Sequence, residues 1–276
     1  MMNKLIDEAG YRDKRDSLLN HTALILALEE TYMQFIATCL QNSTQAITDD
    51  FNSAIELMPF WINYPPLQRG RAPTGQAIPW QEVGETVIGA HAIRSIIQKM
   101  PSIRHPGLPS GADIRFMTDD ALIHLDIKIT GPNDRADEVV ASPNQISGDG
   151  QYWENGGIKN APVIINGQRA SMIFQPELPP FYIKDDKILV CLTYFLKGVY
   201  SVSQLGKQPL DYLELICVPN GLLAFMGINY NQSVSGLFIP GKDEQTHAKK
   251  RVRVRMHPLA TVDAWRHTLI WKRPTE

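Results

Sequence analysis

The pattern of hydrophobic and polar positions changes along the chain, from a helical period in the N-terminal third to alternation in much of the rest. Apolar residues recur at helical spacing in three segments, so we predict helices over residues 16–40, 48–57 and 79–100. Pro79 suits the first turn of the last helix, where its missing N–H leaves no hydrogen bond unmade. The expected buried stripe of that helix consists of Val83, Val87, Ala90 and Ile97.

Apolar runs with many β-branched residues predict strands in the remainder of the chain. They lie at residues 114–117, 122–129, 187–195, 212–218, 222–226 and 251–255. Residues 142–169 are polar and rich in glycine, which predicts a loop that surrounds a ligand or partner. Helices followed by strands in this order indicate an α/β or α+β domain around a central sheet.

The first two strands are expected to form a hairpin, because turn-forming residues 118–120 separate them. If Asp119 and Asp120 form the centre of the turn, Asp113 lies directly opposite Asp126. The period of two along the second strand divides its side chains between two faces. One face carries Ile123, Leu125, Ile127 and Ile129, and the other carries His124, Asp126 and Lys128. The first face is therefore core, and the second is available for chemistry.

The polar face of this hairpin predicts a metal site. Two carboxylates directly opposite each other lie about 5 Å apart and repel unless a cation separates them, and hard oxygen ligands suit Mg²⁺. Lys128 follows on the same face, within reach of a scissile phosphate. His124 shares the face, but packing is the more common role of a strand histidine. The pattern is short, and an exposed hairpin with a solvated Asp/Lys pair explains these residues equally well.

Composition narrows the class of protein. With 276 residues, 43% of them hydrophobic, the chain can bury a full core, as one large domain or two small ones. No apolar stretch approaches the length of a membrane span and no signal-peptide pattern is present, so we expect a soluble cytoplasmic protein. Cys39, Cys191 and Cys217 lie far apart in apolar surroundings, which argues against a disulfide framework or a zinc site.

A net charge of −2 argues against a nonspecific coat for nucleic acid, so any contact with DNA must be local. The alternation over residues 251–255 predicts a strand with its valines inward and a row of arginines outward, Arg251, Arg253 and Arg255. Such a ribbon fits the DNA major groove, where arginine binds guanine through two hydrogen bonds. The alternative is a charged edge strand that prevents aggregation. A turn at residues 240–244 adds Lys242 and two carboxylates able to accept from a cytosine amine.

A series of motifs carries a resemblance to a known family. They are Pro-Phe-Trp-Ile-Asn-Tyr-Pro-Pro-Leu at residues 59–67, Ile-Pro-Trp-Gln-Glu-Val-Gly-Glu at 78–85, Leu-Asp-Ile-Lys at 125–128, Ser-Pro-Asn-Gln at 142–145, Pro-Gly-Lys-Asp at 240–243 and Arg-Val-Arg-Val at 251–254. From about residue 50 to residue 255 the chain resembles the BglI-type restriction endonucleases. This resemblance implies the α/β fold of PD-(D/E)XK nucleases, a central mixed β-sheet flanked by helices. We expect one domain over residues 1–276, with a helical part at about 1–58, a catalytic core at about 59–200 and a DNA-reading part at about 201–257.

The resemblance also implies an activity. It is that of a homodimeric type II enzyme that cleaves double-stranded DNA with Mg²⁺ at an interrupted palindrome, GCCNNNNNGGC, leaving 3′ overhangs and working beside a cognate DNA methyltransferase. Two alternatives are a nuclease of the same fold in repair or recombination, and a DNA-binding protein whose catalytic site has decayed. The complete Asp/Asp/Lys set argues against decay, and the matching base-reading residues argue against a repair enzyme.

Residue by residue, the family's metal-binding aspartates fall on Asp113 and Asp126, and the backbone carbonyl of Ile127 is the expected third ligand. Its active-site lysine falls on Lys128, and a glutamate on the preceding helix falls on Glu85. In the implied mechanism Mg²⁺ stabilises charge on the phosphate and lowers the pKa of a water molecule. Lys128 orients that water or stabilises the phosphate during in-line attack.

The family's base-reading residues fall on four positions that are unchanged in type, Asp134, Lys242, Arg251 and Arg253. Glu244 stands where the family has aspartate, so its reach toward a cytosine differs. Ala112 replaces the proline that usually precedes the first catalytic aspartate, which loosens the loop geometry. We therefore expect any change in specificity to arise at Glu244.

Overall fold

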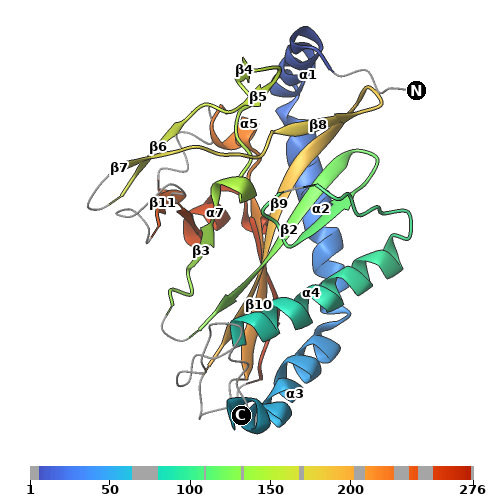
Figure 1. Cartoon of the computed structure of the whole chain (residues 1–276), viewed down its shortest axis with the longest axis vertical. Coiled ribbons are helices and arrows are strands. Elements are labelled where there is room, and N and C mark those ends of the chain that lie inside the picture. Colours follow the sequence, from blue (N-terminus) through green and yellow to red (C-terminus); the bar gives the residue numbers. More distant parts are fainter. Residues whose placement is uncertain are drawn as a thin grey trace.

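A mixed β-sheet forms the middle layer of the protein, with helices on one face and a smaller antiparallel sheet on the other (Figure 1). The computed structural model describes residues 6–63, 80–108, 110–131, 134–167, 171–201, 209–226, 236–241 and 251–274. Lys242 and Glu244, two of the predicted base-reading residues, lie outside the described residues. The expectation of a central mixed sheet flanked by helices is confirmed.

Among the described residues, four α-helices precede the sheet. They are α1 (Glu8–Asn20), α2 (Thr22–Gln41), α3 (Thr44–Asn63) and α4 (Trp80–Lys99). The single helix predicted over residues 16–40 is in fact two, because His21 leaves the helical conformation and its N–H caps the carbonyl of Leu18. The helix predicted over residues 48–57 is longer at both ends, and the one predicted over residues 79–100 is confirmed as α4.

Helix α4 packs on the sheet through a different stripe from the expected one. Of the predicted stripe, Ala90 and Ile97 are exposed, Val87 is partly buried and the Val83 side chain lies outside the described residues. The stripe that the helix buries includes Ile88, His91, Ala92, Ser95 and Ile96. Small residues set this contact, since a Cβ on Gly84 would come within 2.5 Å of the Ile129 side chain. The helix therefore approaches the second strand closely, where a larger residue would not fit.

The central sheet runs in the order β1-β2-β9-β10-β13, and β8 pairs with β9 outside this path. Its strands are β1 (Ile114–Met117), β2 (Ala121–Thr130), β8 (Phe181–Lys184), β9 (Lys187–Tyr200), β10 (Leu210–Val218) and β13 (His267–Lys272). The pair β2–β9 is parallel, and the other pairs are antiparallel. The structure thus extends the strands predicted at residues 187–195 and 212–218.

The two faces of the sheet bury different cores. The aliphatic residues of β2 predicted to face the core, among them Ile123, Leu125 and Ile127, pack with residues of α1 to α4. On the other face Phe195, Ile216 and Val218 pack against a second sheet of order β11-β12-β3. That sheet consists of β3 (Glu138–Ala141), β11 (Phe238–Pro240) and β12 (Val252–Arg255), and helix α7 (Met256–Val262) follows it directly.

Two predictions from the pattern were wrong. The segment at residues 142–169 is more than a loop, because it contains η3 (Pro143–Gln145), the hairpin β4 (Tyr152–Glu154) to β5 (Gly157–Lys159), and β6 (Val163–Asn166), which pairs with β7 (Ser171–Phe174). The strand predicted at residues 222–226 is instead the short helix α5 (Gly221–Ala224). The Asn220 side chain accepts from the N–H of Leu222 and caps this helix, which a strand pattern cannot anticipate.

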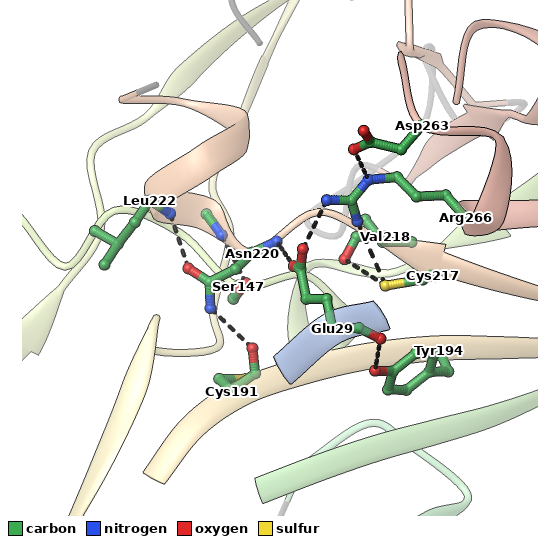
Figure 2. Close-up of polar contacts among 11 residues, drawn as sticks. Glu29, Ser147, Cys191, Tyr194, Cys217, Val218, Asn220, Leu222, Asp263 and Arg266 are labelled. Carbon is green, nitrogen blue, oxygen red and sulfur yellow. Dashed lines mark hydrogen bonds and ion pairs between the residues drawn. The ribbon is translucent and has the colours of Figure 1, made fainter. Parts of the chain in front are cut away.

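A buried polar network links α2 to residues 263–266 near the C-terminus (Figure 2). The Glu29 carboxylate forms an ion pair with Arg266 at 2.7 Å and accepts from the N–H of Asn220. Arg266 also donates to Asp263, and the Tyr194 hydroxyl donates to the Glu29 carbonyl. Glu29 and Arg266 are both fully buried, so removal of either would leave an uncompensated charge inside the fold.

Helix α2 has the length and composition of a membrane span, with a mean hydropathy of 1.3 over its apolar window. The sequence analysis found no such stretch, because Glu29 and Glu30 interrupt it. In the structure the helix contacts α4, β9, β10 and β13, and Glu29 is fully buried in an ion pair with Arg266. These are the features of a core helix rather than of a helix in lipid.

Candidate active site

The hairpin β1–β2 has the predicted register. Ile114 faces Leu125 and Phe116 faces Ile123, so Asp113, just before β1, comes beside Asp126. The N–H of Ile127 donates to Oδ2 of Asp113 at 2.6 Å, which holds this exposed aspartate against the second strand. The two carboxylates expected to bind a metal are therefore brought together by the local strand pairing.

Asp126 is almost completely buried and has two polar contacts. Its Oδ1 accepts from the Gln145 side-chain amide at 2.6 Å, and its Oδ2 lies 2.5 Å from Nζ of Lys128. Lys128 is thus the charged partner of Oδ2, and no further hydrogen bond reaches that oxygen among the described residues. An ionised carboxylate oxygen has more than one lone pair, so Oδ2 can bind a cation in addition to Lys128.

Burial raises the pKa of Asp126 to about 6, and the neighbouring charge of Asp113 adds to the increase. The positive charge of Lys128 and the hydrogen bond from Gln145 oppose this shift. A raised carboxyl pKa next to a second carboxylate indicates a site where negative charge gathers in a poorly solvated place. Such a site favours a bound cation at neutral pH.

The donor set fits a hard divalent cation. No group of three or more His, Cys, Asp or Glu side chains that could hold a metal occurs in the part of the chain that the structure describes. Asp113 and Asp126 would thus supply two oxygen ligands, and carbonyls, water or substrate oxygens would complete the shell. Mg²⁺ is commonly held in this way, by one or two carboxylates with water and phosphate oxygens.

Lys128 reaches the site from the strand position expected. Its side chain is about a quarter exposed, and its Nζ lies 5.6 Å from the centre of the Phe195 ring. In the parallel pair β2–β9, Lys128 is the neighbour of Lys197. Lys197 is fully buried, and its Nζ donates to the carbonyls of Ala136 and Glu138. Of these two lysines, only Lys128 has access to solvent and to a substrate.

His124 shares the face of Asp126 but is a packing residue, as the more common role of a strand histidine suggests. Its ring is fully buried, stacks on Tyr182 and hydrogen-bonds Tyr182 and Ser110. Burial, with a smaller contribution from the charge of Arg115, lowers the pKa of His124 to about 4. The ring is therefore neutral at physiological pH.

Glu85 lies on α4, next to Gly84 where the helix approaches β2 most closely. The side chain of Glu85 is partly buried. Helix α4 packs on the face of β2 that carries Ile127. The backbone of Glu85 therefore lies on the opposite side of the sheet from the side chains of Asp126 and Lys128. The prediction that Glu85 belongs to the catalytic group stays a prediction.

Gln145 contacts the site but was not predicted as a site residue. It ends the turn at η3, where its side-chain oxygen Oε1 accepts from the N–H of Ser142 and its side-chain N–H groups donate to Asp126 and to the Gly111 carbonyl. The signal was present in the sequence as Ser-Pro-Asn-Gln, the spacing of a capping box. The sequence alone did not show that this turn packs against the catalytic hairpin.

The predicted DNA-reading strand is β12, and it is the central strand of the small sheet. The alternative of a charged edge strand is therefore wrong. Arg251 is exposed and Arg255 is partly buried, but Arg253 is only 9% exposed. The expected row of three outward arginines is thus incomplete. The reason is that Nη1 of Arg253 forms an ion pair with Glu138 of β3 at 2.5 Å.

Glu138, at the start of β3, forms ion pairs with two arginine side chains. Its other carboxylate oxygen lies 2.8 Å from Arg135, and these two arginines hold the pKa of Glu138 below its usual value against the effect of burial. Asp134, another predicted base-reading residue, is exposed on the short connection from β2 to β3. Strand β2 therefore leads, through Asp134, to β3 of the sheet that also contains Arg253.

Comparison with known proteins gives consistent matches over nearly the whole chain. The sequence model of the family described as restriction endonuclease BglI matches residues 7–270. The type II restriction enzyme BglI of Bacillus subtilis is 36% identical over 274 residues, which cover 91% of this chain and 92% of that protein. The crystal structure of restriction endonuclease BglI bound to its DNA recognition sequence matches with a TM-score of 0.84 and 34% identity, over 95% of each chain.

A more distant structure shares the fold alone. The tetrameric restriction endonuclease SfiI, bound to cognate DNA, matches with a TM-score of 0.64 over 88% of this chain and 82% of that chain. Its sequence identity of 12% is too low to carry a residue-level comparison.

Proposed function

Because the chain belongs to the BglI restriction endonuclease family and is a type II site-specific deoxyribonuclease, we propose that it uses Mg²⁺ to cut both strands of an interrupted palindrome. The proposed site is GCCNNNNNGGC, with cleavage that leaves 3′ overhangs. The observation that carries the proposal is the juxtaposition of Asp113, Asp126 and Lys128 on one hairpin. The enzyme would act in the cytoplasm beside a DNA methyltransferase that protects the host's own sites.

In the proposed mechanism Asp113 and Asp126 hold the divalent cation, with the backbone carbonyl of Ile127 as a further ligand. When bound, the cation supplies Lewis-acid stabilisation of the charge that develops on the scissile phosphate. Oδ2 of Asp126 supports this role, because Lys128 is its charged partner among the described side chains and a lone pair remains for the cation. The carboxylates also exclude other anions from the site, so only an anion that arrives with a cation is accommodated.

Lys128 is proposed to stabilise the scissile phosphate and to orient the attacking water. Its ammonium is held at 2.5 Å from Asp126 and is partly exposed, so it is preoriented without being sequestered. A positive charge fixed beside the pentacovalent phosphate lowers the barrier, because it needs no reorganisation as negative charge develops. The ammonium also donates hydrogen bonds that orient the attacking water for in-line displacement. Glu85, if it reaches this site, would add a further acceptor for that water.

Sequence reading is proposed for β12 and the segments beside it. Arg251 and Arg253 would each bind a guanine, Asp134 and Glu244 would accept from cytosine amines, and Lys242 would donate to a base or phosphate. The ion pair with Glu138 suits Arg253 for this task, because it fixes one nitrogen of the guanidinium and leaves the others to point in a defined direction. Strand β12 has only four residues, which limits readout to a few adjacent base pairs, as a GCC half-site requires.

Arg251→Ala and Arg253→Lys are each expected to weaken binding to the specific site by about 1–3 kcal/mol per half-site, while affinity for random DNA changes little. Lysine keeps the charge that neutralises Glu138 but cannot form the bidentate pair with guanine. Fluorescence anisotropy with specific and random duplexes in Ca²⁺ measures both affinities. Arg135→Ala is the matched control, since Arg135 contacts the same carboxylate from an exposed position. Equal losses on both duplexes would mean that these arginines contact only phosphate.

Cleavage of both strands at a two-fold symmetric sequence needs two hairpin sites related by a dyad, so we propose that a homodimer acts on DNA. Incubation with plasmid DNA and Mg²⁺, followed by sequencing of the ends, tests the site and the overhang together. Changes in the GCC or GGC triplets should abolish cutting at limiting enzyme, and changes in the unread central bases should alter it only modestly through DNA shape. Continuous cut sites, or a monomer on DNA in sedimentation experiments, would contradict the proposal.

A further inference from the structure

One short turn contacts both halves of the candidate active site. The turn is Ser142–Gln145, which closes on itself because the side-chain oxygen Oε1 of Gln145 accepts from the N–H of Ser142. From this fixed position the Gln145 amide donates to Oδ1 of Asp126 at 2.6 Å and to the Gly111 carbonyl at 3.1 Å. The amide therefore links the side chain of one catalytic aspartate to the backbone that leads into the other, Asp113.

A second contact of the same turn reinforces this link. The N–H of Gly111 donates to the Asn144 carbonyl at 3.2 Å. A Cβ on Gly111 would lie only 2.2 Å from the Asn144 side chain, so the two segments pack without space between them. Because Gly111 is two positions before Asp113, the turn fixes the start of β1 as well as the carboxylate of β2.

The chemistry of Gln145 is that of a positioning group. A neutral amide donor stabilises the ionised form of a buried carboxylate without adding a charge that would compete for a cation. It occupies Oδ1 of Asp126 and so leaves Oδ2 to Lys128 and to a cation. Gln145 is itself only 6% exposed, which leaves it little freedom to release the carboxylate.

We propose that Gln145 is a positioning residue of the nuclease, which holds the Asp126 carboxylate and the start of β1 in the arrangement that binds the divalent cation. Its loss would weaken cation binding rather than DNA binding or folding. The inference rests on the proposed function, because it takes Asp126 as a ligand of that cation. Groups that orient metal ligands typically contribute 10- to 100-fold to metal affinity.

The test uses Gln145→Met, which keeps the length of the side chain and removes its hydrogen bonds, and Gln145→Asn, which keeps the amide but shortens its reach. Gln175→Met is the matched control, since the Gln175 amide donates to the Asn160 carbonyl away from the aspartates. Specific DNA is titrated with Ca²⁺ in the presence of each protein, and fluorescence anisotropy gives the half-saturating Ca²⁺ concentration. Thermal unfolding of each metal-free protein is measured alongside.

Both Gln145 variants are expected to raise the half-saturating Ca²⁺ concentration by about tenfold or more, while DNA affinity at saturating Ca²⁺ stays within about twofold of that of the parent protein. Cleavage by the variants should recover in part at high Mg²⁺ concentration, as a defect in cation affinity requires. Gln175→Met should respond to Ca²⁺ as the parent protein does.

An unchanged Ca²⁺ midpoint in either folded variant would overturn the role of Gln145. A shift of equal size in Gln175→Met would also overturn it, because any loss of a buried hydrogen bond would then have the same effect. If Gln145→Met fails to fold, Gln145→Asn carries the test alone. A parent protein whose specific binding ignores Ca²⁺ and that does not cleave in Mg²⁺ would refute the proposed function, which is distinct from a failure confined to the variants.

Discussion

Asp126→Asn is expected to abolish DNA cleavage and, in the same molecule, to stabilise the metal-free protein at neutral pH. Cleavage is lost because an asparagine amide is a poor substitute for a carboxylate ligand of Mg²⁺. Stability rises because Asp126 is ionised in a buried place where its pKa in the folded protein, about 6, exceeds its ordinary value of 3.8. The gap of about two units corresponds to roughly 3 kcal/mol at most.

The raised pKa of Asp126 determines the pH range in which the two proteins differ in stability. The folded state holds the proton of Asp126 more tightly than the unfolded state, so the free energy of unfolding of the parent protein falls as pH rises from about 4 to about 6. Asparagine removes this dependence. The advantage of the variant should therefore be absent near pH 4, grow through this window and remain level above it.

Thermal unfolding of the two metal-free proteins between pH 4 and pH 8 measures the effect. Asp149→Asn provides a control, because Asp149 is also buried but lies away from Lys128 and accepts hydrogen bonds from backbone N–H groups of Gln151 and Ala161. That variant should lose stability rather than gain it. An Asp126→Asn protein that is less stable than the parent at pH 8 would mean that Asp126 is satisfied in the fold without a cation.

Lys128→Ala is expected to reduce the cleavage rate by about 10³-fold or more, with specific binding in Ca²⁺ nearly unchanged. The ammonium acts on charge that develops during the reaction, so its loss affects the transition state rather than the ground state. Single-turnover cleavage in Mg²⁺ and anisotropy in Ca²⁺ separate the two effects.

Lys187→Ala, at the exposed start of β9, is the control for the loss of a lysine from this sheet. It should cleave as fast as the parent protein. Cleavage by Lys128→Ala at a rate within about tenfold of the parent would remove Lys128 from the mechanism. The solvated Asp/Lys pair would then be the correct interpretation of the hairpin.

The hairpin could be predicted from sequence because its determinants are local. The turn at Asp119 and Asp120 fixes the register, and the period of two then assigns every residue of β2 to a face. Asp113, Asp126 and Lys128 meet through these two rules alone. The sequence motif fitted a metal site and an exposed hairpin with a solvated Asp/Lys pair equally well. The structure separates these two interpretations, because Asp126 is buried and Lys128 contacts it.

The remaining features depend on partners remote in sequence. Arg253 was expected to face solvent, but Glu138, 115 positions away, binds it, and no pattern within β12 contains this information. The stripe of α4 was misplaced because Gly84 rather than a bulky residue meets Ile129. Helix α5 forms where Asn220 supplies a cap, and its apolar residues would suit a strand equally well. The periodic pattern of the sequence therefore could not predict contacts and caps that depend on other segments of the chain.

The ion pair between Arg253 and Glu138 has a consequence for how this enzyme can change over evolutionary time. In its proposed role Arg253 recognises a guanine, yet the same guanidinium neutralises a buried carboxylate on another strand. A substitution of Arg253 by an uncharged residue also leaves that carboxylate without one of its two counter-charges, which is typically destabilising by several kcal/mol. A lineage that drifts toward a new target must therefore keep a cation at this position, alter both positions or pass through a poorly folded ancestor. If methylation protects a single sequence, as proposed, this coupling acts as a safeguard, because uncharged variants at Arg253 that begin to attack unprotected sites tend to unfold first.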